Sequence, residues 1–121
     1  MGTRVLIADD ASFMRQMIRE IIEPEGFEIV AEAADGREVE GQFQAHVPEL
    51  VLLDVAIPPG SAAEVVQALR ACDPGARVVL ASALGQESAV LEALEAGALD
   101  FVVKPFQPEY VLHTLRRALE K

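Results

Sequence analysis

The sequence contains no tryptophan, a single cysteine, and aromatic residues at only 5% of its 121 positions. The lone Cys72 cannot form an internal disulfide and favours a reducing compartment, so we expect a cytoplasmic protein. No apolar run approaches the ~20 residues that a membrane-spanning helix needs. The segment after Met1 also lacks the layout of a signal peptide, so we expect no insertion into a membrane.

Basic residues are scarce as well, since 10 Lys and Arg stand against 20 Asp and Glu and the net charge is −10. A surface of this kind argues against nucleic acid as a partner, because such binding relies on Lys and Arg contacts to phosphates. A hydrophobic content of 51% excludes a disordered chain. The length predicts one domain over residues 1–121, with no output domain attached.

Four short apolar runs each end on polar residues that suit phosphate chemistry. The residues at these ends are Asp9 with Asp10, Asp54, Ser82 and Lys104. Unbroken apolar runs of this length are typical of strands buried on both faces of a parallel sheet. Ligands bind such sheets outside the carboxyl ends of the strands, at the point where the strand order reverses. The sequence therefore predicts one crevice that holds three carboxylates, one hydroxyl and one ammonium group.

Amphipathic segments alternate with these runs and predict five helices. We expect them over 12–23, from Asp35, from Ser61, around 90–94 with an end at Gly97, and from Pro108. Asp35 with Glu38, and Ser61 with Glu64, have the spacing of a capping box. The apolar side chains expected on the buried faces of the last two helices are Val90, Leu91 and Leu94, and Val111, Leu112, Leu115 and Leu119. Residues 27–33 partly alternate, with Glu28 and Glu32 on one side, as an edge strand would. Five alternating βα units predict a doubly wound α/β fold with a parallel sheet of strand order 2-1-3-4-5.

The predicted crevice crowds like charges. Two carboxylates ~4 Å apart repel by about 4 kcal/mol at an effective dielectric constant near 20, so the cluster either raises a pKa or recruits a cation. Carboxylate oxygens favour Mg²⁺, and a carboxylate beside that ion can attack phosphorus. Lys104 can then pair with a phosphoryl oxygen, and Ser82 can donate a hydrogen bond to another.

The motifs around these residues resemble the receiver domains of bacterial two-component response regulators. They are Val-Leu-Ile-Ala-Asp9-Asp10, Leu-Leu-Asp54-Val-Ala-Ile-Pro58, Ala-Ser82-Ala-Leu-Gly85-Gln and Phe101-Val-Val-Lys104-Pro105-Phe106. The resemblance covers the whole chain and is strongest to single-domain chemotaxis receivers of the CheY type. It implies the flavodoxin-like (βα)5 sandwich for which the same strand order is known.

The resemblance implies roles for the acidic residues. Asp54 would accept a phosphoryl group from a sensor histidine kinase. Asp10, Asp54 and the backbone carbonyl of Ala56 would bind Mg²⁺, with Asp9 acting through water. No enzymatic activity is expected beyond phosphotransfer to the chain's own Asp54 and slow self-dephosphorylation.

The resemblance also implies a conformational switch. Ser82 and Phe101 would form the switch pair, Lys104 would hold the phosphoryl group, and the Lys104–Pro105 bond would be cis. The surface of the fourth helix, fifth strand and fifth helix would then change its affinity for a downstream effector protein. The chain departs from the family after Asp54, where Gly60 and Ser61 are expected to supply the turn and the helix cap.

Other functions remain open from the sequence. The chain could shuttle phosphoryl groups to a histidine phosphotransfer protein, or signal by binding alone. A small Mg²⁺ phosphohydrolase would need a second Asp two residues after its nucleophile, but the residue two after Asp9 is Ala11. A flavin or nucleotide carrier would need a Gly-rich or Ser/Thr-rich phosphate loop after the first strand, where this chain has Asp9 and Asp10.

Overall fold

A parallel sheet lies at the centre of the computed structural model, which describes residues 2–121. Its strands are β1 (Thr3–Ala8), β2 (Phe27–Ala33), β3 (Leu50–Asp54), β4 (Val78–Ser82) and β5 (Asp100–Val103). The strand order is β2-β1-β3-β4-β5, as the alternation of elements predicted. The order reverses between β1 and β3, so the two strands that carry the acidic residues are neighbours.

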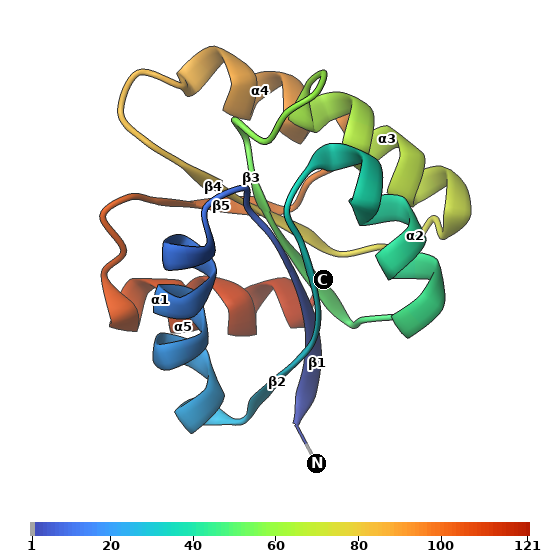
Figure 1. Cartoon of the computed structure of the whole chain (residues 1–121). Coiled ribbons are helices and arrows are strands. Elements are labelled where there is room, and N and C mark those ends of the chain that lie inside the picture. The colour runs from blue at the N-terminus through green and yellow to red at the C-terminus, as the bar shows by residue number, and fades with distance from the viewer. Residues whose placement is uncertain (1) are drawn as a thin grey trace.

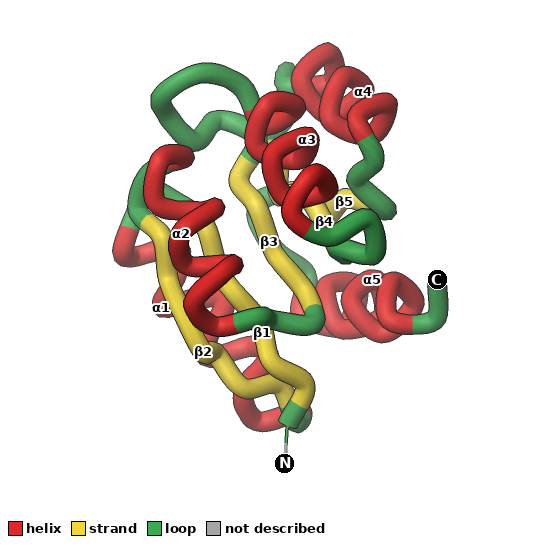
Figure 2. The backbone as a smooth tube through the Cα atoms, turned by 90° about the vertical axis from the view of Figure 1, so that its right-hand side faces the viewer, coloured by secondary structure: helices red, strands yellow, loops and turns green. Residues whose placement is uncertain are grey.

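Helices cover both faces of the sheet (Figures 1 and 2). They are α1 (Ser12–Ile22), α2 (Gly36–His46), α3 (Ala62–Cys72), α4 (Glu87–Ala96) and α5 (Pro108–Leu119), with a 3-10 turn over Glu23–Glu25. One core lies between the sheet and α1 with α5, and a second lies between the sheet and α2, α3 and α4. The sheet is therefore buried on both faces, and every residue of β3 and β4 is buried.

The edge strand β2 contains a residue that has no partner on β1. The register shifts so that Val5 pairs with Ile29 whereas Leu6 pairs with Ala31. A shift of one residue moves the following side chains to the other face of the sheet. The expectation that Glu28 and Glu32 share one side of this strand is therefore wrong, and Glu32 faces α1.

Helix ends largely follow the predicted capping residues. Ser61 forms a reciprocal capping box with Glu64 at the start of α3. Asp35 caps α2, but the Glu38 carboxylate accepts from the N–H of Ala34 rather than from that of the cap residue. The first helix ends at Ile22, one residue earlier than predicted, because the 3-10 turn follows it.

Two predicted apolar helix faces differ from the structure. Leu91 was expected on the buried face of α4, but it is 59% exposed and Ala93 is buried in its place. On α5, Leu112 and Leu119 are only partly buried, whereas Thr114 and Ala118 are fully buried. Within the described part of the chain, no helix is long and apolar enough to cross a membrane.

Candidate functional site

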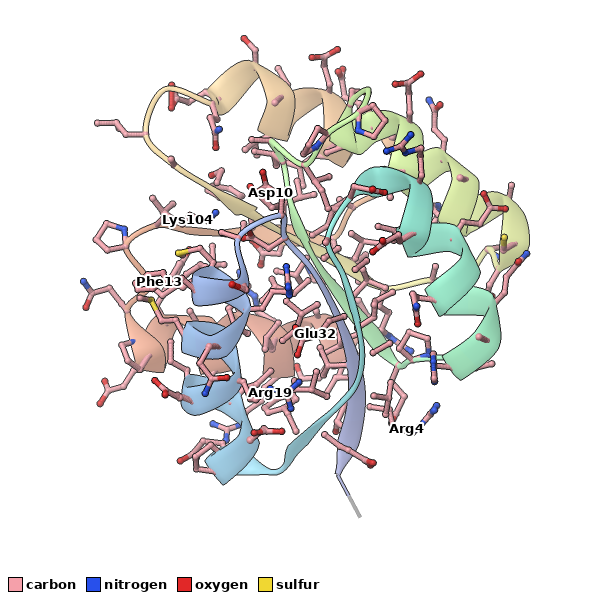
Figure 3. All side chains as sticks on the ribbon, viewed as in Figure 1. Arg4, Asp10, Phe13, Arg19, Glu32 and Lys104 are labelled. Carbon is pink, nitrogen blue, oxygen red and sulfur yellow. The ribbon has the colours of Figure 1, made fainter. Side chains whose placement is uncertain are left out.

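Three carboxylates meet at the carboxyl ends of β1 and β3. Asp9, Asp10 and Asp54 each place an oxygen within 4.8 Å of the other two. Asp9 and Asp54 are buried, while Asp10 is exposed at the end of β1 (Figure 3). This is the juxtaposition that the sheet topology predicted, because parallel strands end at the same edge.

One cation serves the two buried carboxylates. Lys104 follows β5, and its Nζ lies 3.2 Å from Oδ2 of Asp9 and 3.5 Å from Oδ1 of Asp54. Three carboxylates therefore share the crevice with a single ammonium group that contacts two of them, and the crevice keeps an excess of negative charge. The Lys104–Pro105 peptide bond is cis, as the resemblance implied.

The environment of Asp54 disfavours its charged form. Burial raises the pKa of this carboxyl and the nearby Asp9 adds to the rise, while the N–H of Ala56 and the Lys104 ammonium act against it. The N–H of Ala56 donates to Oδ1 of Asp54 at 3.2 Å. A carboxylate whose charge is only partly balanced favours the arrival of a cation at this point.

The donor set fits a hard divalent cation. The three carboxylates offer the oxygen ligands that Mg²⁺ prefers, and Mg²⁺ normally uses only one or two of them while it keeps several waters. Asp9 is already engaged, since its Oδ1 accepts from the N–H of Ala11 at 2.9 Å and its Oδ2 contacts Lys104. The exposed Asp10 and the exposed Ala56, two residues after Asp54, border the solvent side of the crevice.

Ser82 and Phe101 line a common cavity of about 450 Å³. Ser82 is buried at the end of β4, and Phe101 is partly buried on β5. The other residues that line the cavity are mostly apolar. Val103 comes from β5, and the rest come from α4 and its preceding loop, including Leu84, Val90, Leu91 and Leu94. The Ser82 side chain and the Phe101 ring thus border the same cavity, which lies next to α4.

The loop after Asp54 is anchored at several points. Gly60 adopts a φ of +76° and Ser61 caps α3, as the sequence predicted for this departure from the family pattern. The N–H of Gly36 donates to the carbonyl of Pro58 at 2.7 Å, and the Pro58–Pro59 bond is cis. Neither of these two features was predicted. The hydrogen bond holds the loop against the start of α2.

One residue that contacts the site was missed by the sequence analysis. Nη1 of Arg15, on α1, donates to the backbone carbonyl of Asp9 at 2.5 Å. Nothing in the motif marks this arginine, because a charged residue on the first helix reads as an exposed one. The only available signal is its place near the start of the helix that follows the acidic pair, as the fourth residue of α1.

Comparison with known proteins places these features in a family. The response regulator receiver domain matches residues 5–116. The chain is 42% identical to the chemotaxis protein CheY of Thermotoga maritima over 117 residues, which cover 97% of this chain and 98% of that protein. It is 42% identical to the chemotaxis protein CheY of Bacillus subtilis over 119 residues, which cover 98% and 99%.

Solved structures give the same result. A CheX–CheY–BeF3–Mg²⁺ complex from Borrelia burgdorferi superposes with a TM-score of 0.89 at 34% identity, covering 98% of this chain and 90% of that chain. The response regulator domain of Thermotoga maritima CheB superposes with a TM-score of 0.88 at 28% identity, covering 100% and 98%. The chain therefore belongs to the response regulator receiver domain family, as a homologue of the CheY chemotaxis regulators.

Proposed function

We propose that this protein is a phosphorylation-activated switch in which Asp54 accepts a phosphoryl group from a sensor histidine kinase. The observation that carries the proposal is the position of Asp54. It is buried at the end of β3, beside Lys104 and opposite the acidic pair at the end of β1. An Asp54 oxygen would attack phosphorus while the bond from phosphorus to the donor histidine breaks.

Asp10, Asp54 and the carbonyl of Ala56 would hold Mg²⁺, with Asp9 acting through water. The exposure of Asp10 and the full engagement of the Asp9 carboxylate support this division. The ion would neutralise charge on the phosphoryl oxygens. The chain's own groups would do the rest of the binding. Lys104 would pair with a phosphoryl oxygen, and the Ser82 hydroxyl would donate to another.

The switch would run from Ser82 to Phe101 and then to the surface of α4, β5 and α5. The cavity that both side chains line supports this route, since it gives the ring a place to move. Exposed apolar side chains on that surface, namely Leu84, Leu91, Val103 and Tyr110, support the binding of a downstream effector protein. The CheY relatives support a role in chemotaxis, and we propose that the protein acts in the cytoplasm.

Chemical labelling tests the assignment of Asp54. Incubation with Mg²⁺ and a small acyl phosphate should give an adduct that is stable in acid and labile in base, as expected for an acyl phosphate. Asp54→Asn should abolish the adduct, because an amide oxygen is a poor nucleophile. Asp35→Asn is the control, since Asp35 only caps α2 and the change should leave labelling intact. Labelling of Asp54→Asn at the parental rate would show that another residue is the acceptor.

Spectroscopy with a phosphoryl mimic tests the switch. Adding beryllofluoride and Mg²⁺ to the full chain should shift backbone amide resonances at Val90, Phe101 and Val111 as well as near Asp54. A ligand shifts a conformational equilibrium only when it binds the two states with different affinity. A response confined to the neighbours of Asp54 would refute the route through Ser82 and Phe101.

A further inference from the structure

Asp9 is held at each of its polar atoms. Its N–H donates to the carbonyl of Ala33 at 3.0 Å, and its Oδ1 accepts from the N–H of Ala11 at 2.9 Å. Its Oδ2 lies 3.2 Å from Nζ of Lys104. Its carbonyl accepts from Nη1 of Arg15 at 2.5 Å. The last contact acts on the peptide group that joins this residue to the next one in the chain.

Arg15 is itself fixed in place. Its side chain is 16% exposed, and its Nε lies 2.6 Å from Oε1 of Glu32 on β2. Glu32 also accepts from Arg19, which is one helical turn further along α1 and also pairs with Glu23 at 2.7 Å (Figure 3). A planar guanidinium that is held on two sides by directional contacts has little freedom to rotate. The Asp9 carbonyl therefore meets a rigid donor rather than a mobile surface side chain.

The direction of the Asp9 carbonyl determines how the chain continues into Asp10. The peptide group is planar, so fixing its oxygen also fixes the N–H and the Cα of the following residue. The Asp10 side chain is exposed, and its approach to the other two carboxylates depends on this backbone direction. Arg15 thus acts one residue away from a carboxylate that it does not itself contact.

We propose that Arg15 is a positioning residue for the cation site, which orients the Asp10 carboxylate by holding the Asp9 carbonyl. The inference rests on the proposed function, which assigns Asp10 as a direct ligand of Mg²⁺. Residues that orient metal ligands in this way commonly contribute 10-fold to 100-fold in metal affinity. Because Arg15 is held by Glu32, the edge strand β2 shares in building a site that lies at the ends of β1 and β3.

Charge and position predict opposite outcomes when Arg15 is replaced. Removing a positive charge near a cation site strengthens cation binding through Coulomb attraction alone. Losing the orientation of Asp10 weakens it. Arg19 provides a matched control, because it carries the same charge on the same helix and contacts the same Glu32 but does not bond to the Asp9 carbonyl.

Titration of the full chain with Mg²⁺ alone, followed by NMR amide shifts, separates the two effects. Arg15→Met should bind Mg²⁺ about tenfold more weakly than the parent. Arg15→Lys keeps the charge but loses the planar pair of donors, so it should fall between them. Arg19→Met should bind within about twofold of the parent or slightly more tightly. Before Mg²⁺ is added, the Asp10 amide nitrogen resonance should move in both Arg15 variants and stay in place in Arg19→Met.

The outcomes are distinguishable. If the parent binds Mg²⁺ and Arg15→Met binds it equally or more tightly, the positioning role is wrong while the proposed function stands. If the parent does not bind Mg²⁺ and Asp10→Ala changes nothing, the metal assignment of the proposed function fails, and the inference fails with it. If Arg15→Met does not fold, Arg15→Lys decides, and parental affinity together with an unmoved Asp10 resonance would overturn the proposal.

Discussion

Glu32 and Asp54 are carboxylates on strands of the same sheet, the first partly exposed and the second buried, and their surroundings shift their pKa values in opposite directions. Burial raises the pKa of Glu32, but hydrogen bonds and charge from Arg19 and Arg15 outweigh it, so the net pKa is lowered. Burial also raises the pKa of Asp54, where Asp9 adds to the effect and the single Lys104 does not compensate, so the net pKa is raised. The guanidinium groups of Arg15 and Arg19 both contact Glu32, whereas the single ammonium group of Lys104 contacts both Asp9 and Asp54.

This difference separates an ion pair that supports the fold from a site that awaits a ligand. The cluster of Arg15, Arg19, Glu23 and Glu32 contains two positive and two negative groups, so it balances its own charge, and it ties α1 to β2. The crevice around Asp54 keeps an unbalanced negative charge, which lowers stability without a cation and favours binding when one arrives. Neutralising the carboxylate should therefore destabilise the fold at Glu32 and stabilise it at Asp54, whereas removing a cation should cost more in the crevice than in the ion-pair cluster. The following predictions test this from the largest effect to the smallest.

Replacing the one cation of the crevice should have the largest effect on stability. Lys104→Met leaves two buried carboxylates without a cation, and we expect the free energy of unfolding at pH 7 to fall by about 3 kcal/mol without Mg²⁺. Saturating Mg²⁺ should recover much of this loss by binding only the folded state. Urea unfolding with and without Mg²⁺ measures both. Arg19→Met should lose less, because Glu32 keeps Arg15, and Mg²⁺ should not restore it.

Neutralising Glu32 should destabilise the fold by a smaller amount. Glu32→Gln loses the charge that two arginines contact, and we expect a loss of about 1–2 kcal/mol after allowance for the partial exposure of the pair. Glu28→Gln is the matched control, because this exposed residue lies on the same strand and points to the other face of the sheet. The control should change the free energy of unfolding by less than about 0.5 kcal/mol. Equal losses of stability in Glu32→Gln and Glu28→Gln would show that the ion pairs of Glu32 do not stabilise the fold.

Neutralising Asp54 should stabilise the fold. Asp54→Asn removes a charge that repels Asp9 while its side-chain oxygen still accepts from the N–H of Ala56, and we expect a gain of about 1 kcal/mol at pH 7 without Mg²⁺. Adding Mg²⁺ should reduce this difference in the free energy of unfolding, because the cation binds the parent more tightly than the variant and stabilises it more. A loss of stability in Asp54→Asn would mean that Lys104 already balances the crevice.

The pH dependence of these two variants gives the smallest and most specific signal. Asp54 has a raised pKa when folded, so above its usual 3.8 the unfolded chain ionises first, and the parent loses stability as pH rises through that window. The advantage of Asp54→Asn should therefore vanish below about pH 4. Glu32 has a lowered pKa, so its contribution is present above its usual 4.5 and is lost as pH falls through the folded value. The deficit of Glu32→Gln should shrink on acidification. The measurement is the free energy of unfolding of each variant minus that of the parent, followed as a function of pH. If this difference changed with pH in the same direction for both variants, the opposite pKa shifts of Asp54 and Glu32 would be wrong.

The strands and the crevice could be predicted because they follow from local pattern and topology. The apolar runs specify buried parallel strands, and the βα alternation specifies which strand ends meet. Asp9, Asp10, Asp54, Ser82 and Lys104 all lie at strand ends, so their convergence follows without side-chain detail. The comparisons confirm the family and the fold, while the individual roles of these residues stay predictions.

The ion-pair cluster could not be predicted, because it depends on one extra residue. The alternation in 27–33 placed Glu28 and Glu32 on the same side, but the register shift on β2 turns Glu32 toward α1. No residue in that stretch is a glycine or proline that would signal such an irregularity. Because the sequence does not show which face of the sheet Glu32 occupies, it cannot predict that Arg15 contacts both that carboxylate and the Asp9 carbonyl. The exposure of Leu91 was missed for a related reason, since helical spacing does not say how wide the buried face is.

The cavity under α4 gives the proposed switch a calorimetric signature. Its walls are mainly apolar and include Phe101 on β5 and Val90 and Leu94 on α4, and the side chains of Phe101 and Leu94 are partly exposed to solvent. If the Phe101 ring fills the space in the active state, apolar surface is dehydrated at a distance from the phosphoryl group. Dehydration of apolar surface lowers the heat capacity of the system, whereas the ionic contacts around Asp54 contribute little of that kind. The change with temperature in the enthalpy of the transition to the active state would thus measure how much of the apolar cavity surface is buried, and it would depend little on the contacts around Asp54.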